Sequence, residues 1–207
     1  MSVAIIDYGS GNLRSAARAF ERVAEDASAI QVTRSPEVVA QASHVVLPGV
    51  GAFADCVAGL KALPGMIEAM EEQVLRRGRP FLGICVGMQM LFERGHEHGM
   101  YDGLGWLKGE VAPIVAKGLK IPHMGWNDLT IAHPHPLLEG IMTGDHAYFV
   151  HSYYAACRNS GDMLATVSYG QIMAAVVGRG NIMGTQFHPE KSQETGLRLL
   201  KNFLSMK

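Results

Sequence analysis

Two short segments carry residue types that nucleophilic hydrolases use. Gly83-Ile84-Cys85-Val86-Gly87 places a thiol between two glycines, and Gln186-Phe187-His188-Pro189-Glu190 places an imidazole and a carboxylate on either side of a proline. In this chain order they supply a nucleophile, a base and a group that orients the base. In hydrolases, a Gly-x-nucleophile-x-Gly pattern marks a strained turn from a strand into a helix, where larger side chains would collide. Together the segments predict covalent catalysis at Cys85.

The setting of Cys85 differs from that of the other two cysteines, Cys56 and Cys157. A free cysteine is more often an inert, buried small residue, and that interpretation stands for Cys56 and Cys157. Cys85 is expected at a helix N-terminus, where the helix dipole and free N–H groups stabilise a thiolate. Residues 88–92 are expected to continue this helix.

His188 and Glu190 are separated by one residue, Pro189. Residues i and i+2 of an extended segment face the same side, and the proline ring fixes the backbone between them. Glu190 can then accept a hydrogen bond from one ring nitrogen of His188, which leaves the other nitrogen to take the thiol proton. This pair is a moderate signal alone and a strong one beside the cysteine turn.

Gly49-Val50-Gly51 follows an expected strand, as Cys85 does. Its plainest interpretation is an ordinary turn. Its functional interpretation is an oxyanion hole, with one backbone N–H from this loop and one from Val86. Such N–H groups stabilise the charge that develops on a carbonyl oxygen during acyl transfer.

Two other motifs do not predict a cofactor. The segment 9–14 lacks the third glycine of a dinucleotide fingerprint, because Arg14 stands in that position. His96-Glu97-His98 is a short tract with no further ligand in view, so no metal site is expected. The twelve methionines are most simply core residues.

The composition is that of a globular chain and excludes several classes of function. The chain has 207 residues, 48% of them hydrophobic and 18% charged, with a formal net charge of -1. One domain over residues 1–207 is expected. The charge gives no reason to expect nucleic acid, and no apolar run approaches the roughly 20 residues of a membrane span. Three widely spaced cysteines and the absence of a signal peptide favour a reducing, cytoplasmic location.

The pattern of elements changes near the middle of the chain. The first half alternates strands and helices, which predicts a parallel sheet covered on both faces, with its site at the carboxyl ends of the strands. The second half holds short strands and turns, which predict an antiparallel or mixed extension of the sheet. The expected strands are 3–7, 29–33, 44–47, 80–84, 111–115, 121–130, 147–154, 164–168, 172–177 and 181–187; the expected helices are 13–22, one from Ser35, 64–77 and 192–204, the last with an apolar stripe of Leu197, Leu200 and Leu204 beside Leu199 and Phe203.

The segments 82–89 and 184–192 resemble the class I, triad-type glutamine amidotransferases. Within them, the segments 7–12, 48–53, 121–127 and 148–153 are similar to the glutaminase subunits of imidazole glycerol phosphate synthases. The similarity covers the whole chain in order. It implies the flavodoxin-like α/β fold of this class, an open, mostly parallel sheet flanked by helices, with antiparallel additions in the second half.

The resemblance also implies a reaction, a partner and a role for each matching residue. Glutamine is hydrolysed without a cofactor, and the ammonia passes to a (β/α)8-barrel cyclase subunit, with which the chain forms a heterodimer that makes imidazole glycerol phosphate for histidine biosynthesis. The implied roles are catalysis for Cys85, His188 and Glu190, backbone oxyanion donors at Gly51 and Val86, glutamine binding for Gln89, Glu97, Ser152 and Tyr153, and partner contact for Asn12, Trp126, Tyr148 and Lys191.

The chain departs from the family pattern in two places, and two alternatives stay open. Val86 replaces a common leucine, which leaves the backbone donor in place, and the stretch 94–98 is looser than the family's acidic run, which makes Glu97 less secure than Gln89. One alternative is the glutaminase of another class I amidotransferase, such as anthranilate or aminodeoxychorismate synthase, which would lack the Trp126 segment. The other is a non-catalytic interaction protein on the same fold.

Overall fold

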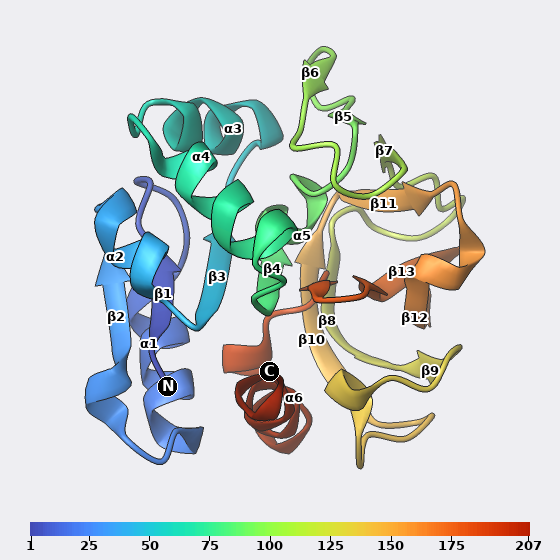
Figure 1. Cartoon of the computed structure of the whole chain (residues 1–207). Coiled ribbons are helices and arrows are strands. Elements are labelled where there is room, and N and C mark those ends of the chain that lie inside the picture. The colour runs from blue at the N-terminus through green and yellow to red at the C-terminus, as the bar shows by residue number, and fades with distance from the viewer.

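A large mixed sheet runs through the computed structural model, which describes all 207 residues (Figure 1). Its first five strands in space are parallel and its last three antiparallel, which confirms the sheet predicted from the change of pattern along the chain. In spatial order the strands are β2 (Ile30–Thr33), β1 (Val3–Ile6), β3 (His44–Gly49), β4 (Phe81–Cys85), β14 (Ile182–Thr185), β13 (Ile172–Arg179), β12 (Met163–Ser168) and β9 (Thr130–Ile131).

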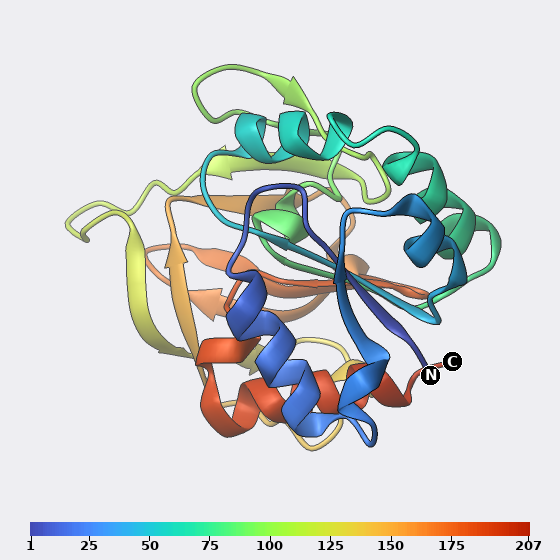
Figure 2. The ribbon, with the colours of Figure 1, turned by 90° about the vertical axis from the view of Figure 1, so that its left-hand side faces the viewer.

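Helices cover both faces of the parallel part of the sheet. Figure 2 shows α1 (Leu13–Val23) and α6 (Gln193–Ser205) side by side on one face. The opposite face carries α2 (Pro36–Gln41), α3 (Phe53–Lys61) and α4 (Met66–Glu71), the last continued by a π turn over Glu72–Arg76. No helix is both long and apolar enough to span a membrane. Short 3-10 turns lie at Ala27–Ala29, Pro136–Leu138, Ser160–Asp162 and Pro189–Lys191.

Two smaller sheets extend the second half of the chain. One pairs β8 (His123–Asp128) with β10 (His146–His151), and the other orders β11 (Tyr153–Cys157), β7 (Gly109–Pro113), β5 (Arg94–Gly95) and β6 (Tyr101–Asp102). The single strand predicted over 147–154 is therefore wrong. The chain leaves one sheet and enters the other at Ser152, where the His151 ring binds the Tyr153 carbonyl at 2.9 Å and holds the bend. The strand predicted over 121–130 is also divided, into β8 and β9.

A tight glycine contact sets the orientation of the closing helix. A Cβ at Gly196 would lie 1.9 Å from the Pro189 carbonyl oxygen, so α6 packs against the preceding turn closely enough to exclude any side chain there. With Gly196 facing inward, the buried positions at helical spacing are Leu199, Leu200 and Phe203. The stripe predicted through Leu197 and Leu204 is rotated from this one, and both residues are only partly buried.

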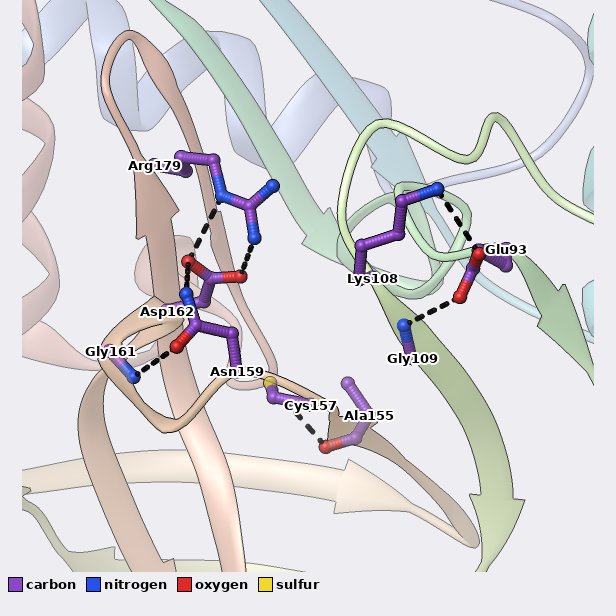
Figure 3. A network of polar contacts seen from close by, with 9 residues as sticks. All are labelled: Glu93, Lys108, Gly109, Ala155, Cys157, Asn159, Gly161, Asp162 and Arg179. Carbon is purple, nitrogen blue, oxygen red and sulfur yellow. Dashed lines mark hydrogen bonds and ion pairs between the residues drawn. The ribbon is translucent and has the colours of Figure 1, made fainter.

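Figure 3 shows two polar networks in the second half of the fold, one around Asp162 and one around Glu93. In one, the Asp162 carboxylate is buried and accepts hydrogen bonds from the Arg179 guanidinium, one of them at 3.1 Å, and from Asn159 at 3.2 Å. In the other, Glu93 accepts from Lys108 Nζ at 3.2 Å and from the backbone N–H of Gly109 at 3.0 Å. The first network encloses a charge, whereas the second is open to solvent.

Arg179→Met is expected to lower the free energy of unfolding by about 1–3 kcal/mol, because it leaves a buried carboxylate with only an amide partner. The expected loss in the free energy of unfolding is smaller than for a fully buried ion pair, because the Arg179 side chain is 44% exposed. Lys108→Met is the matched control, with an expected loss of at most about 1 kcal/mol, since its pair with Glu93 is on the surface. Urea unfolding of both variants measures the two losses in the free energy of unfolding. Equal losses would contradict the claim that the Asp162 network contributes more than the Glu93 network.

Candidate active site

Cys85 ends β4 at the turn into the short helix α5 (Val86–Gln89) and has a positive φ of 56°. This conformation is strained for a residue with a side chain and persists only where the surroundings enforce it. Close packing enforces it here. A Cβ at Gly87 would lie 1.8 Å from the Leu47 carbonyl oxygen, and one at Gly83 would lie 2.6 Å from that of Gly87. The strand-to-helix turn predicted from the glycine pattern is confirmed.

The helix that follows is shorter than the sequence predicted. The expected continuation to Phe92 is wrong, because α5 ends after one turn at Gln89. Two of the next carbonyl groups are taken by other parts of the chain: Met90 accepts from the Leu104 N–H at 2.7 Å, and Leu91 accepts from Leu107 at 2.9 Å. A single turn has a small dipole, so stabilisation of a thiolate depends mainly on neighbouring side chains.

The His188 ring connects Cys85 with Glu190. Its Nδ1 lies 2.9 Å from Glu190 Oε1, and both side chains are almost fully buried. The other ring nitrogen makes no hydrogen bond to another group of the chain, which leaves it available to the nearby Cys85 thiol. Burial alone lowers the pKa of His188, but the hydrogen bonds to Cys85 and Glu190 and their negative charges outweigh burial and raise the pKa to about 9. The arrangement therefore favours the protonated form of the His188 ring.

The backbone around His188 differs from the extended segment that the sequence predicted. Residues Pro189–Lys191 form a 3-10 turn, which begins at the proline because its fixed φ suits the first position of a helix. The strand β10 and Ser192 hold this turn in place. The His188 N–H donates to the Tyr148 carbonyl at 3.1 Å, and the buried Ser192 hydroxyl donates to the His188 carbonyl at 2.7 Å.

The loop after β3 lies directly beside Cys85, since Gly49 pairs with Cys85 in the sheet register. Gly51 has a φ of 106°, and its N–H has no acceptor within the chain. Val86 is the first residue of α5, where a helix leaves the N–H without an intrahelical acceptor. The intervening Val50 peptide is held on the other side, because the Ser10 hydroxyl donates to its carbonyl and accepts from its N–H at 3.3 Å.

A cleft of about 290 Å³ opens at this edge of the sheet, and its volume suits a small metabolite. It brings together Cys85 and all four residues expected to bind glutamine. No group of three or more His, Cys, Asp or Glu side chains is placed to hold a metal ion. The lining residues are Val50, Gly51, Cys85, Val86, Gln89, Glu97, Pro122, Val150, His151, Ser152 and Tyr153.

Two of these four residues make further contacts within the chain. Gln89 donates both protons of its amide nitrogen, one to the Tyr153 carbonyl and one to Gln186 Oε1, each at 3.0 Å. Its side-chain oxygen, Oε1, has no hydrogen-bond partner in the chain. The Glu97 carboxylate accepts from the Phe53 N–H at 2.7 Å, which joins the looser stretch 94–98 to the start of α3.

Three of the four residues expected at a partner interface form one cluster near His188. The Trp126 and Tyr148 rings lie 5.9 Å apart on paired strands, and Lys191 Nζ lies 5.6 Å from the Tyr148 ring centre. Trp126 is 48% exposed, which is unusual for so large an apolar side chain. The fourth residue, Asn12, precedes α1, which packs against the turn that carries Lys191.

The sequence reasoning missed Gln186 and Ser192, which are buried and contact Cys85 and His188. A signal for Gln186 was available. It stands two residues before His188, so the rule that placed Glu190 beside His188 also places Gln186 on that face of an extended segment. No such rule identifies Ser192, because its contact depends on how the 3-10 turn meets α6.

Comparison with known proteins agrees with this geometry. The sequence profile described as Glutamine amidotransferase class-I matches residues 4–206. The chain is 56% identical to the "Imidazole glycerol phosphate synthase subunit HisH" of Agrobacterium fabrum, over 100% of both chains. It is 57% identical to the protein of the same name from Rhodospirillum rubrum, over 99% of this chain and 98% of that one.

Solved structures share the fold at lower identity. A crystal structure of a glutamine amidotransferase superposes with a TM-score of 0.74 at 19% identity, over 99% of this chain and 97% of that one. The structure of PurLQS from Thermotoga maritima superposes with a TM-score of 0.72 at 20% identity, over 98% of this chain and 97% of that one. The chain belongs to the class I glutamine amidotransferase family and, within it, to the HisH subunits of imidazole glycerol phosphate synthase.

Proposed function

We propose that this chain hydrolyses glutamine at Cys85 and delivers the ammonia to a cyclase subunit that makes imidazole glycerol phosphate. The observation that carries the proposal is the placement of Cys85 at the edge of a small cleft, beside a buried His188 whose ring binds Glu190 at 2.9 Å and whose pKa is raised by both neighbours. Membership of the HisH subunits supports the choice of synthase over the glutaminases of anthranilate or aminodeoxychorismate synthesis. Residues 1–207 act as one amidotransferase domain, which the single continuous core supports.

The proposed reaction uses the thiol as a nucleophile. With the proton of the Cys85 thiol held by His188, the sulfur attacks the side-chain amide carbon of glutamine, forming the S–C bond. Breakage of the C–N bond releases ammonia, which takes the proton from His188. Water then attacks the thioester, His188 accepts a water proton and returns it to the departing sulfur, and glutamate leaves. The N–H groups of Gly51 and Val86 stabilise the oxyanion in both steps.

The cleft offers complementary groups to the amino-acid end of the substrate. An α-ammonium group suits the unpartnered side-chain oxygen of Gln89 and the Glu97 carboxylate. Both accept hydrogen bonds, and the carboxylate also carries a negative charge. Ser152 and Tyr153 line the same cleft, where we place the α-carboxylate. No cofactor takes part in this scheme.

The partner in this proposal is a (β/α)8-barrel cyclase, bound as a heterodimer over the cluster of Trp126, Tyr148 and Lys191. The exposed aromatic surface supports the assignment, since interfaces are enriched in aromatic side chains. Asn12 is assigned to the same interface because it precedes α1, which packs against the turn that carries Lys191. We infer a cytoplasmic location from three free thiols and no disulfide.

The test is the rate of glutamine hydrolysis by the purified chain, alone and with the purified cyclase and its ligand. Glutamate release together with the formation of imidazole glycerol phosphate supports the proposal. If an anthranilate or aminodeoxychorismate synthase subunit raises the rate of hydrolysis and the cyclase does not, the chain is the glutaminase of that other synthase. No hydrolysis under any of these conditions would favour the non-catalytic interpretation.

Glu190→Gln is expected to lower kcat by about 10²-fold while glutamine binding and the fold stay intact. An amide stabilises the imidazolium much less than a carboxylate does, and the loss is smaller than in serine enzymes because a thiol ionises more readily. Glu194→Gln is the control, since Glu194 is exposed on α6 nearby. Steady-state kinetics with saturating glutamine measure the effect, and an unchanged kcat would remove Glu190 from the triad.

The pH profile is expected to follow His188. Because its pKa is raised to about 9, the ring stays protonated through neutral pH and loses its proton only as the pH passes that value. kcat/KM should therefore fall on the alkaline side near pH 9. Glu190→Gln removes one cause of the raised pKa, so the fall should move to lower pH. An alkaline limb that does not move would contradict this assignment.

A further inference from the structure

The geometry points to Gln186 as a fourth member of the catalytic group, whose side-chain amide donates a hydrogen bond to the Cys85 sulfur and stabilises the thiolate. Gln186 Nε2 lies 3.8 Å from Cys85 Sγ, and the glutamine is fully buried. This inference rests on the proposed function of the same site, and it adds a residue that the triad does not contain.

The direction of the Gln186 amide follows from its neighbours. The Tyr153 backbone carbonyl can only accept, so the Gln89 atom 3.0 Å from it must be the amide nitrogen. The same nitrogen lies 3.0 Å from one terminal atom of Gln186, which must then be the oxygen. The remaining terminal atom of Gln186, the one that faces Cys85, is the nitrogen. An N–H donor is therefore aimed at the sulfur.

The Tyr153 carbonyl that fixes this direction also accepts from a line of hydrogen-bonded side chains, His151, His123 and Asn127. It accepts from His151 Nδ1 at 2.9 Å; His151 Nε2 accepts from His123 Nδ1 at 2.9 Å, and His123 Nε2 accepts from Asn127 at 3.1 Å. Burial lowers the pKa of His151 to about 4 and also lowers that of His123. Both rings are neutral at pH 7, so each has one N–H, and every donor in this line has an acceptor.

The sulfur needs such a donor because its other sources of stabilisation are limited. It is buried, and the helix behind it has only one turn. Burial raises the pKa of Tyr8 and Cys56, so these neighbours stay neutral at pH 7. The charged groups that face the sulfur are then His188, paired with Glu190, and the Glu97 carboxylate across the cleft. Gln186 supplies a hydrogen bond to the sulfur from a fully buried side chain.

Gln186 keeps both of its protons throughout the reaction. The thiol proton goes to His188 and leaves with ammonia, as in the scheme above. The hydrogen bond from Gln186 is stronger to a thiolate than to a thioester sulfur, because it is then made to a charge. It therefore favours the resting thiolate and the step in which the thioester releases the sulfur. We call it catalytic because it contacts the reacting atom.

The decisive variant is Gln186→Met, which has a similar size and no donor. The rate of Cys85 alkylation by iodoacetamide, followed by peptide mass spectrometry against pH, should show its midpoint moved up by about one pH unit, a tenfold loss of thiolate at a fixed pH below it. kcat should fall at least about 10-fold. Gln186→Asn keeps an amide but ends one methylene short of the sulfur, and it should show the same upward shift if the methionine variant does not fold.

Gln73→Met is the matched control. Gln73 is also a buried glutamine, and its amide donates to the Ala40 carbonyl at 2.6 Å, away from the cleft. It should lose stability without any shift of the alkylation midpoint. A midpoint in both Gln186 variants equal to that of the wild-type chain would overturn the inference. If the wild-type chain alkylates normally but never hydrolyses glutamine, the proposed function fails, whereas the comparison of midpoints still decides the role of Gln186.

Discussion

Cys85→Ala is expected to abolish glutamine hydrolysis, with a loss on the order of 10⁶-fold in kcat. Loss of the nucleophile removes the covalent route, and the remaining triad members act only through it, so their contributions disappear with it. The fold should survive, because alanine is smaller than cysteine and the strained turn is enforced by the glycines around it. Glutamate release by the variant, bound to the ligand-loaded cyclase, measures the loss.

A diazo ketone that mimics glutamine should form a covalent adduct with Cys85 alone. Cys56 and Cys157 serve as internal controls, since both are free thiols whose pKa is raised by burial, to about 12 for Cys157. Intact mass and peptide mapping identify the labelled residue. An adduct on Cys56 or Cys157, or an active Cys85→Ala variant, would contradict the assignment of the nucleophile.

The parallel half of the fold follows from the sequence because its local and global signals agree. β1, β3 and β4 are fully buried, so each appears as a mainly apolar run, broken only by His44 at the start of β3, and each is followed by a turn with glycine. The positions of Cys85 and Gly51 at adjacent strand ends follow from this alternation alone. A strand ends at the same edge of the sheet as its parallel neighbour, whatever the details of the loops.

The parts that the sequence did not predict depend on contacts between distant segments. The break at Ser152 is set by a contact of the His151 ring with the next strand, and the early end of α5 is set by N–H groups of Leu104 and Leu107. α3 follows the glycine loop and was not expected at all. Gln186 was quoted within a motif, but its hydrogen bond to Cys85 needs the register of β14 beside β4. Local patterns do not contain this information.

Direct hydrogen bonds join the cluster of Trp126, Tyr148 and Lys191 to the segment that carries His188, so a partner bound at the cluster can affect His188. The backbone of β10 joins them, because the Tyr148 carbonyl accepts from the His188 N–H and its N–H donates to Ser192 at 3.0 Å. The loop at 49–51, where we propose one of the oxyanion donors, is restrained as well, by Ser10 on one side and by the Glu97 contact to Phe53 on the other. A partner that shifts β10 or this loop changes the groups around the sulfur directly.

The isolated chain is therefore expected to be a poor glutaminase and to gain about 10²–10³-fold in kcat with the ligand-loaded cyclase, the effect of aiming one oxyanion donor. Free hydrolysis would release ammonia to solvent, and the glycines of the loop at 49–51 permit a peptide to change direction. The gain counts as allosteric only if the cyclase ligand favours one of two loop states. Rates are compared for the chain alone, with unliganded cyclase, and with cyclase plus a substrate analogue.

Two variants show whether the surface cluster transmits this gain. Trp126→Ala should keep the rate of the isolated chain and lose most of the activation, because the ring contacts Tyr148 and not the cleft. Ile172→Ala is the matched control, since Ile172 is 74% exposed on β13 and lies outside the cluster. Its activation should equal that of the wild-type chain. If the isolated wild-type chain already hydrolyses glutamine as fast as the loaded complex, the loop is not gated and the assigned partner loses its main functional support.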